Sequence, residues 1–469
     1  MAKRKESRKS AKKAKRPING ETLRAAVAWA VDQQIFAELK VHGNTGWRIA
    51  DLILLAVIWV WSNDATLTGA FVEAHRWSMD VLGRVAVESY QGFIKALVTW
   101  TASWLPLLQD HLHRHMEEQG GEHWRIGRWV ALAVDGSRVS VPRTKDNEKA
   151  FCAPNFGNSR QAQSRRSKKG KRVRRKAKDP QPVKPQIWVT LLWHMGLQMP
   201  WSWKTGPSYA AERDHFREML HEQKFPKDTL FCCDAGFTGY DLWKAITDGG
   251  HAFLIRVGGN VTLLRKLGYV RERAGIVYCW PNAVASKGQP PLVLRHLQLR
   301  VGRRVMHMVT NVLDEQALTD AEAVRLYQLR WGIELQFRTV KQTFGRRKLR
   351  SRTPGRAYVE LDWSLVGLWL IQLFAVKEQV DIGEIPEHCS VALAIQVIRE
   401  AVRRWWDRPE DGLAAKLQGA TKEKYTQHSS KKARYSPNYK DKPAAGKPVI
   451  RNATPWHKAR LNKCSAYAA

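Results

Sequence analysis

The chain contains two short, almost entirely apolar runs that each end in an aspartate followed by a small residue. The first run covers residues 129–134 and ends at Asp135, and the second covers residues 229–233 and ends at Asp234. Continuous apolar runs of this length, bounded by turn residues, are typical of strands buried on both faces of a sheet. Such strands need helices to cover them, so we predict an α/β fold.

The segments between and after these runs predict the other elements of the domain. Apolar residues that recur every three and four positions indicate helices, and compact apolar stretches indicate strands. The expected strands are 187–193, 197–203 and 252–257, and the expected helices are 209–223, 240–247, a long helix from Asp320 to about Phe344, and a helix near 358–377.

Changes in composition and hydrophobic pattern along the chain predict six regions. We expect a basic, disordered arm, a helical region, a first part of the α/β domain that carries an exposed basic loop, a β-rich insertion, a second part of the α/β domain, and a helical and basic C-terminal region that becomes irregular after about residue 418. The corresponding ranges are 1–20, 21–120, 121–257 with the loop at 159–184, 258–319, 320–380 and 381–469.

The charge is strongly one-sided, with 78 Lys and Arg against 43 Asp and Glu and a formal net charge of +35. An excess of this size indicates a polyanionic partner, with nucleic acid as the first candidate and an acidic membrane surface as the second. The segment from Arg160 to Lys178 alone contains eleven basic residues and no acidic one. Like charges without apolar residues do not pack, so we expect this segment to be an exposed loop.

Neither a membrane span nor a disulfide framework is expected. The longest apolar runs, 52–61 and 365–376, fall short of the roughly 20 residues that cross a bilayer, and we interpret both as buried helices. No signal peptide is recognisable in the basic N-terminus. The six cysteines have no paired spacing, which is typical of a reducing compartment. A histidine cluster at 111–123 could bind a metal, but it has no accompanying ligand motif.

The most specific pattern lies on the long helix expected after Asp320. Tyr327, Arg330, Glu334 and Lys341 fall at offsets of 0, 3, 7 and 14, which places them within about 60° of one helical face. Arg338 lies just beside this face. An ordinary solvent-exposed face with an ion pair four residues apart is the alternative interpretation. The apolar residues on the other side of the helix favour a polar face presented at the edge of a site.

This spacing, Y-x2-R-x3-E-x6-K, resembles the YREK motif of DDE transposases of the insertion-sequence-four family. The resemblance covers about residues 125–380 and implies a ribonuclease-H-like catalytic domain with a β-rich insertion, preceded by a helical N-terminal region. It also implies that Asp135, Asp234 and Glu334 are the catalytic residues and metal ligands. The expected cofactor is Mg²⁺ as two ions, with Mn²⁺ as a substitute, because hard divalent cations prefer carboxylate oxygens.

The same resemblance implies DNA-binding roles for the basic residues on and after the motif helix. Arg330 and Lys341 would hold phosphates next to the bond that is cut, and Tyr327 would hydrogen-bond the DNA backbone or stack. Further DNA-backbone contacts are expected from Arg338, Arg346, Arg347, Lys348 and Arg350. Trp280 in the insertion could stack on a displaced base or pack in the core, and both interpretations stay open at this point.

The sequence therefore predicts a DNA transposase that binds the terminal inverted repeats of its insertion sequence, cuts the strands and joins them to target DNA. The resemblance implies a homodimer in the synaptic complex and a cytoplasmic, nucleoid-associated location in a prokaryote, with no membrane partner. Two alternatives remain: a metal-dependent DNA nuclease of the same fold that does not join strands, and a catalytically idle DNA-binding derivative.

Overall fold

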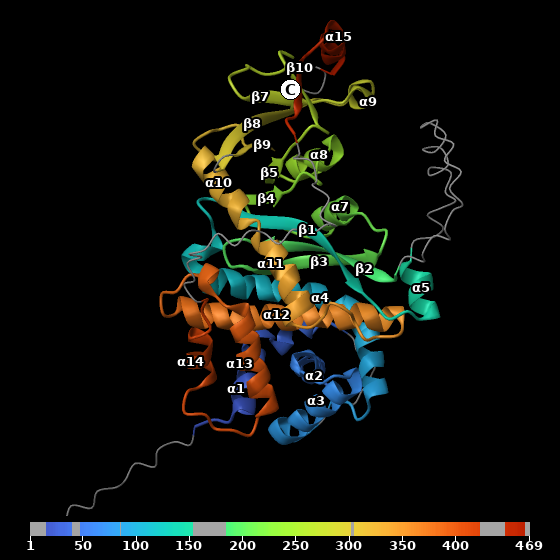
Figure 1. The fold of residues 1–469 in the computed structure, drawn as a ribbon, viewed down its shortest axis with the longest axis vertical. Helices are drawn as coiled ribbons and strands as arrows, with labels where there is room; N and C mark the ends of the chain where they lie inside the picture. The colour runs from blue at the N-terminus through green and yellow to red at the C-terminus, as the bar shows by residue number, and fades with distance from the viewer. Residues whose placement is uncertain are drawn as a thin grey trace, which may run out of the picture.

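A single sheet of ten strands runs through the molecule, in the order β10-β6-β7-β8-β9-β5-β4-β1-β2-β3 (Figure 1). The computed structural model describes residues 16–39, 47–84, 86–152, 184–301, 304–422 and 446–464. Of the basic loop expected at 159–184, residues 159–183 lie outside the described residues, as does most of the N-terminal arm.

The half of the sheet that ends at β3 has the topology of a ribonuclease-H-like domain. Its strands are β1 (Val130–Ser140), β2 (Gln186–His194), β3 (Met199–Pro207), β4 (Thr229–Cys233) and β5 (Ala252–Arg256). β1, β2 and β3 pair antiparallel, whereas β4 pairs parallel to both β1 and β5. This order confirms the fold class predicted from the sequence, and the two apolar runs are indeed adjacent central strands.

β1 is longer than expected, so Asp135 does not end it. The strand continues to Ser140 in antiparallel register with β2, whereas its parallel pairing with β4 stops at Val134 opposite Cys233. The apolar run marks only the part of β1 that is buried between two neighbours. Asp135 lies one residue beyond the last pair, at the point where β1 and β4 separate.

The insertion is β-rich, as predicted, but it extends the sheet of the ribonuclease-H-like half. Its strands β6 (Thr262–Arg265), β7 (Ile276–Cys279), β8 (Leu292–Val301) and β9 (Arg304–Thr310) are joined to the central strands because β9 pairs antiparallel with β5. A short helix, α9 (Asn282–Ala285), connects β7 and β8.

The expectation of an irregular C-terminal region after about residue 418 is wrong for the last described segment. Residues Val449–Asn452 form β10, which pairs parallel with β6, and Pro455–Cys464 form the helix α15. Figure 1 shows this red segment at the top of the molecule, beside the insertion. The apolar residues Val449 and Ile450 allow this segment to form a strand that joins the sheet, although the prolines and basic residues around it predicted no regular secondary structure.

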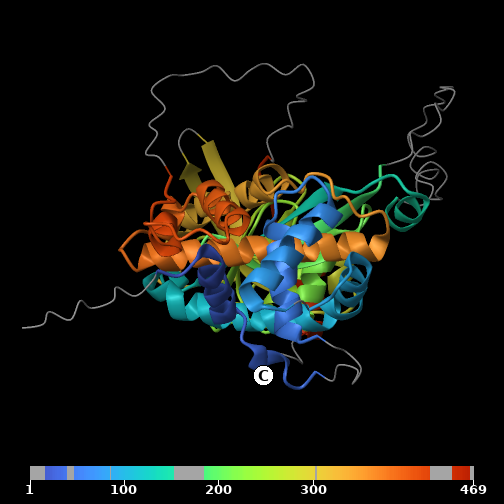
Figure 2. The ribbon, with the colours of Figure 1, turned by 90° about the horizontal axis from the view of Figure 1, so that it is seen from below.

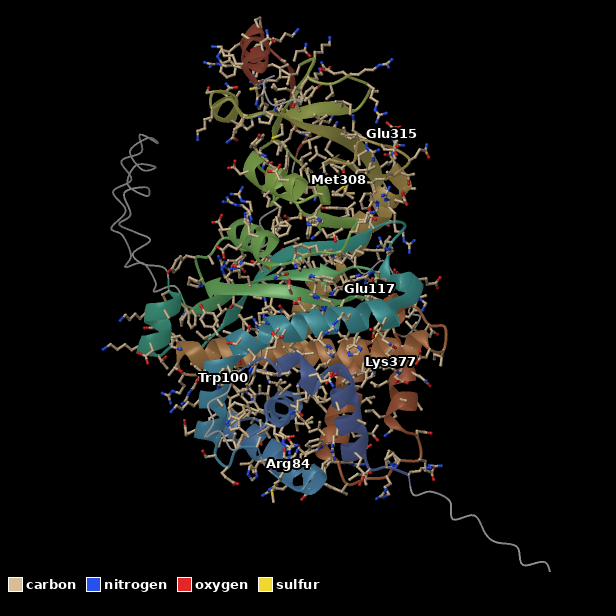
Figure 3. The ribbon with its side chains drawn as sticks, turned by 180° about the vertical axis from the view of Figure 1, so that it is seen from behind. Arg84, Trp100, Glu117, Met308, Glu315 and Lys377 are labelled. Atoms are coloured by element: carbon tan, nitrogen blue, oxygen red, sulfur yellow. The ribbon has the colours of Figure 1, made fainter. Side chains whose placement is uncertain are left out.

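The N-terminal helical region shares one hydrophobic core with the catalytic domain. The helices α1 (Asn19–Ala30), α2 (Ile49–Trp61), α3 (Leu67–Leu82) and α4 (Tyr90–Gly120) pack with α12 (Pro354–Val380), α13 (Val391–Arg403) and α14 (Leu413–Gln418). Figure 2 shows α12 crossing the width of the molecule, and Figure 3 shows α4 lying beside it, next to the sheet.

By length and composition, α12 could cross a membrane, but 94% of its most apolar window is buried inside the structure. α2 is also buried along almost its whole length. Both apolar runs are therefore helices of the protein core, as the sequence predicted.

The long helix expected from Asp320 to about Phe344 is divided into three pieces. Thr319 caps α10 (Asp320–Leu329), and a tight turn then leads into α11 (Gly332–Arg338) and a π-helical turn at Thr339–Thr343. The amide groups of Ile333 and Glu334 donate to carbonyls only three residues back, which makes this turn tighter than an α-helix. The other α-helices of the described residues are α5 (Lys145–Phe151), α7 (Glu212–Glu222) and α8 (Tyr240–Asp248).

Candidate active site

Asp135 and Asp234 are neighbours at the place where β1 and β4 separate. They follow the last parallel pair, Val134 opposite Cys233, on adjacent strands. The amide of Gly136 donates to Asp135 Oδ1 at 2.8 Å, and the amide of Gly236 donates to Asp234 Oδ1 at 2.7 Å. Each carboxylate is thus oriented by the backbone that follows it, and both are partly exposed.

Glu334 is brought to the same place by α11, which packs on β1. Ile333 and Phe337 are buried beneath the helix, so Glu334 between them stays at the edge of the site. Arg330 Nη2 lies 3.4 Å from Glu334 Oε1, and the guanidinium of Arg330 lies over the ring of Tyr327 at 5.3 Å from its centroid. Three residues of the YREK motif therefore stay together despite the interrupted helix.

Arg330 is itself largely buried, with only 9% of its side chain exposed. Burial by itself lowers the pKa of Arg330, but the nearby Tyr327, Cys232, Asp234 and Asp135 raise it overall. Its Nε has no hydrogen-bond partner among the described residues. The guanidinium is therefore a fixed positive charge between the acidic residues, with one donor unused.

Lys341 reaches the site from the π-helical turn. Its Nζ donates to Ser137 Oγ at 2.5 Å, which ties the turn to β1 two residues after Asp135. Burial lowers the pKa of Lys341, and the charge of Asp135 opposes this effect. The structure thus brings the fourth residue of the motif to the first aspartate, and it adds Ser137, which the sequence analysis did not single out.

The pKa of Asp135 is raised to about 6, first by burial and then by the charges of Asp234 and Glu334. The hydrogen bond from Gly136 and the charge of Arg330 oppose this rise without cancelling it. The mutual repulsion shows that the three carboxylates share one electrostatic site, in which a cation would be stabilised.

Three carboxylates are a suitable donor set for a hard divalent cation such as Mg²⁺. As the side chains stand, no three His, Cys, Asp or Glu residues within the described ranges form a cluster ready to hold an ion. The carboxylates of Asp135, Asp234 and Glu334 therefore border one site without converging on one point. Glu334 faces Arg330 in this arrangement, at 3.4 Å from its Nη2.

Arg346 does not lie where a DNA contact was expected. Only 6% of the residue is exposed, its Nε donates to Ser364 Oγ at 2.8 Å, and its Nη2 donates to the carbonyl of Val60 at 3.3 Å. Burial lowers its pKa to about 10. This residue joins α12 to α2, and from the interior it cannot touch the DNA backbone. The prediction was wrong because a run of basic residues does not reveal which of its members faces inward.

The other basic residues of this set are exposed. Arg347 and Lys348 lie alongside the end of β1, where the amide of Ser140 donates to the carbonyl of Arg347 at 3.3 Å. Arg338 is exposed on α11, and Arg350 donates to the carbonyl of Asp64 at 2.7 Å. Positive charge is therefore available at the surface next to Lys341.

Neither Trp280 nor the histidine cluster belongs to the site. Trp280 is 2% exposed and donates to the carbonyl of Gln289 at 2.8 Å, in agreement with core packing. Among the clustered histidines, His113 stacks on Trp201 at 3.6 Å between ring centroids, and burial lowers its pKa to about 4.

One acidic residue at the site has no counterpart in the sequence prediction. Glu212, in the first turn of α7, has its pKa raised to about 7 by burial and then by Asp234 and Asp135. It borders a hollow of about 450 Å³ that is also lined by Arg138, Trp188, Arg213, Gly236 and Asn260. A larger hollow of about 830 Å³ lies between α3 and α13 and contains none of these carboxylates.

The Transposase DDE domain family matches residues 130–370, which are 241 of the 469 residues. The chain belongs to this family. The matched span contains β1, β4 and α11, and therefore all three carboxylates. Transposases of the DDE class generally use divalent metal ions.

A curated relative is the transposase InsG for insertion sequence element IS4 of Escherichia coli (strain K12). It is 29% identical over 170 residues, which are 34% of this chain and 38% of the relative. The chain thus matches less than half of that protein's length. Among solved structures, a piggyBac transposase synaptic complex with hairpin DNA aligns over 88% of this chain and 85% of that one, with 12% identity and a TM-score of 0.39. That likeness is too distant to support further argument.

Proposed function

We propose that this protein is a DNA transposase that binds the ends of its insertion sequence, cuts the DNA strands and joins them to a target. The proposal rests on the positions of Asp135, Asp234 and Glu334, which lie close together where β1 and β4 separate, within a DDE domain. We further propose Mg²⁺ as the natural cofactor, with two ions in the site and Mn²⁺ as a substitute. When bound, such ions activate the attacking oxygen and stabilise the leaving oxygen.

Phosphate recognition is assigned to the other residues of the motif. Arg330 holds a buried positive charge with an unused Nε donor, and Lys341 is fixed beside Asp135 by Ser137. When Glu334 turns from Arg330 toward the aspartates, the guanidinium becomes free to bind a phosphate oxygen. Tyr327 keeps the Arg330 side chain in place through its ring.

The exposed residues Arg338, Arg347 and Lys348, together with Arg350, are proposed as contacts to the DNA backbone beside the site. The net charge of +35 supports a nucleic acid partner. We propose terminal inverted repeats and target DNA as the bound duplexes, a homodimer in the synaptic complex, and a nucleoid-associated place of action in a prokaryotic cytoplasm without a membrane partner.

The test is a strand-cleavage and strand-transfer assay on duplexes that carry the inverted repeats flanking the gene, with Mg²⁺ and an acceptor duplex. Wild type should cut and join. Asp135→Ala, Asp234→Ala and Glu334→Ala should each lose cleavage by at least about 1000-fold while they still bind the repeat ends, because phosphate contacts come from the basic residues.

The alternatives give different results in the same assay. A nuclease would cut without joining, and an idle derivative would bind without cutting. If all three alanine variants cut DNA like wild type, the proposed function is wrong. The choice of ion is tested with Asp135→Cys, whose thiolate is a poor ligand for Mg²⁺ and a better one for Mn²⁺, so cleavage should be partly restored in Mn²⁺.

A further inference from the structure

Glu212 holds its carboxylate directly over the backbone of the two segments that carry the catalytic aspartates. A methyl group added at Gly136 would lie 2.8 Å from Glu212 Oε2, and one added at Gly236 would lie 3.1 Å from Glu212 Oε1. The same methyl at Gly236 would lie 2.9 Å from Asp234 Oδ1. The oxygens of Glu212 and Asp234 therefore border one small space above Gly236.

The absence of side chains at Gly136 and Gly236 is what admits Glu212 to this place. Trp188 also lies against Gly136, because its Cζ2 would lie 2.5 Å from a methyl group added there. Arg138 in turn lies over the Trp188 ring at 4.6 Å from its centroid. The carboxylate thus lies against Gly136 and Gly236 and borders the adjoining hollow together with Trp188 and Arg138.

The charges around Glu212 make it an unusual residue for a purely structural role. Asp234 and Asp135 are its strongest charged neighbours, ahead of Arg213 and Arg138. Among the described residues, Glu212 forms no ion pair and no hydrogen bond. A partly buried carboxylate beside two others destabilises the ion-free fold.

We propose that Glu212 is a fourth acidic ligand of the active site, which binds the divalent cation together with Asp135 and Asp234 from the side of α7. This inference rests on the proposed function, because it presumes that the aspartates bind the ion. Glu212 lies outside the YREK motif and is supplied by the helix that follows β3. It gives the aspartates a second glutamate besides Glu334, on a separate structural element.

A simple alternative is that Glu212 stabilises α7, since acidic residues in the first turn interact favourably with the helix dipole. Asp214 lies in the same turn and is exposed, so it is the matched control for that role. If Glu212 served the helix alone, Glu212→Gln and Asp214→Asn would lower the melting temperature of the ion-free protein alike and leave ion binding unchanged.

The experiment measures the affinity of the full-length protein for Mn²⁺, without DNA, by titration calorimetry. Four proteins are compared: wild type, Glu212→Gln, Asp214→Asn and Asp234→Asn. The expected result is a Kd for Mn²⁺ that rises about 10- to 100-fold in Glu212→Gln and in Asp234→Asn and stays at the wild-type value in Asp214→Asn. The melting temperature of ion-free Glu212→Gln should equal or exceed that of wild type, because repulsion is removed.

Two other outcomes overturn the inference in distinguishable ways. If Asp234→Asn weakens Mn²⁺ binding but Glu212→Gln does not, Glu212 is not a ligand and the proposed function stands. If neither Asp234→Asn nor Glu212→Gln changes the affinity, the ion does not bind at the aspartates, and the proposed function fails together with the inference. A fall in melting temperature in Glu212→Gln with unchanged Mn²⁺ affinity would assign the residue to the helix.

Discussion

Gly332 lies so close to the indole of Trp193 that a methyl group on its Cα would come within 2.0 Å of the ring carbon Cη2. Trp193 is on β2 and is 1% exposed, so the ring has no room to move away. Gly332 opens α11, two residues before Glu334. The distance between this helix and the sheet, and with it the position of Glu334, depends on the absence of a side chain at Gly332.

Gly332→Ala should therefore push α11 off the sheet. We expect a loss of about 1–3 kcal/mol in the free energy of unfolding, because overpacking a rigid core has this cost. Cleavage should fall as well, since a small displacement of a reacting group is costly. Gly412→Ala is the control, because no atom lies within 4 Å of the added methyl there. Equal stability and activity of the two variants in denaturation and cleavage assays would contradict this packing argument.

The stability of the ion-free protein should depend on the protonation of Asp135. Its pKa is raised from 3.8 to about 6, so the folded chain holds this proton more tightly than the unfolded chain. The folded state binds more protons between about pH 4 and pH 6, and stability is therefore lost as the pH rises through this window.

Thermal melts in a chelator should show this effect as a difference between wild type and Asp135→Asn. The variant should match wild type near pH 4 and become more stable above pH 6, by at most about 3 kcal/mol for a shift of this size. Adding Mn²⁺ should reverse the order at neutral pH, because the ion binds the ionised carboxylate. A difference that does not change with pH would show that Asp135 is not the titrating group.

Arg346 and Arg347 should have opposite phenotypes although they are adjacent. Arg346→Ala removes the hydrogen bonds to Ser364 and Val60 from a buried site and should cost about 2 kcal/mol of stability. Arg347→Ala should leave stability unchanged and lower DNA affinity, with a salt slope reduced by about 0.9 for one lost phosphate contact. Denaturant titrations and binding curves at several salt concentrations check both. Reduced stability in Arg347→Ala with an unchanged salt slope would contradict the prediction that Arg347 contacts the DNA backbone.

Arg330→Ala and Lys341→Ala should reduce cleavage more than binding. Both side chains lie beside the carboxylates, whereas many other basic residues contribute to overall affinity. We expect cleavage of bound DNA to slow by about 100-fold or more and the Kd for the repeat ends to change less than tenfold. Ser137→Ala should show a smaller loss, because it only removes the partner of Lys341. A variant that bound poorly and cut bound DNA at the normal rate would move its residue out of the active site.

The sequence allowed the central strands, the insertion and the three carboxylates to be predicted, because each depends on a local pattern. Apolar runs mark buried strands, and the YREK spacing survives the break at Arg330. Relations set by tertiary packing were not predictable. Arg346 sits in a run of basic residues but points inward, and nothing near Glu212 in the sequence indicates that two distant glycines leave space for its carboxylate.

The position of β10 has a consequence for synthesis of the protein on the ribosome. β6 lies at residues 262–265, but its outer neighbour is supplied by residues 449–452, which are synthesised much later. Until that segment emerges, the insertion presents an open strand edge, which favours pairing with other chains. Premature termination before Val449 should therefore yield a protein that aggregates rather than a smaller working enzyme.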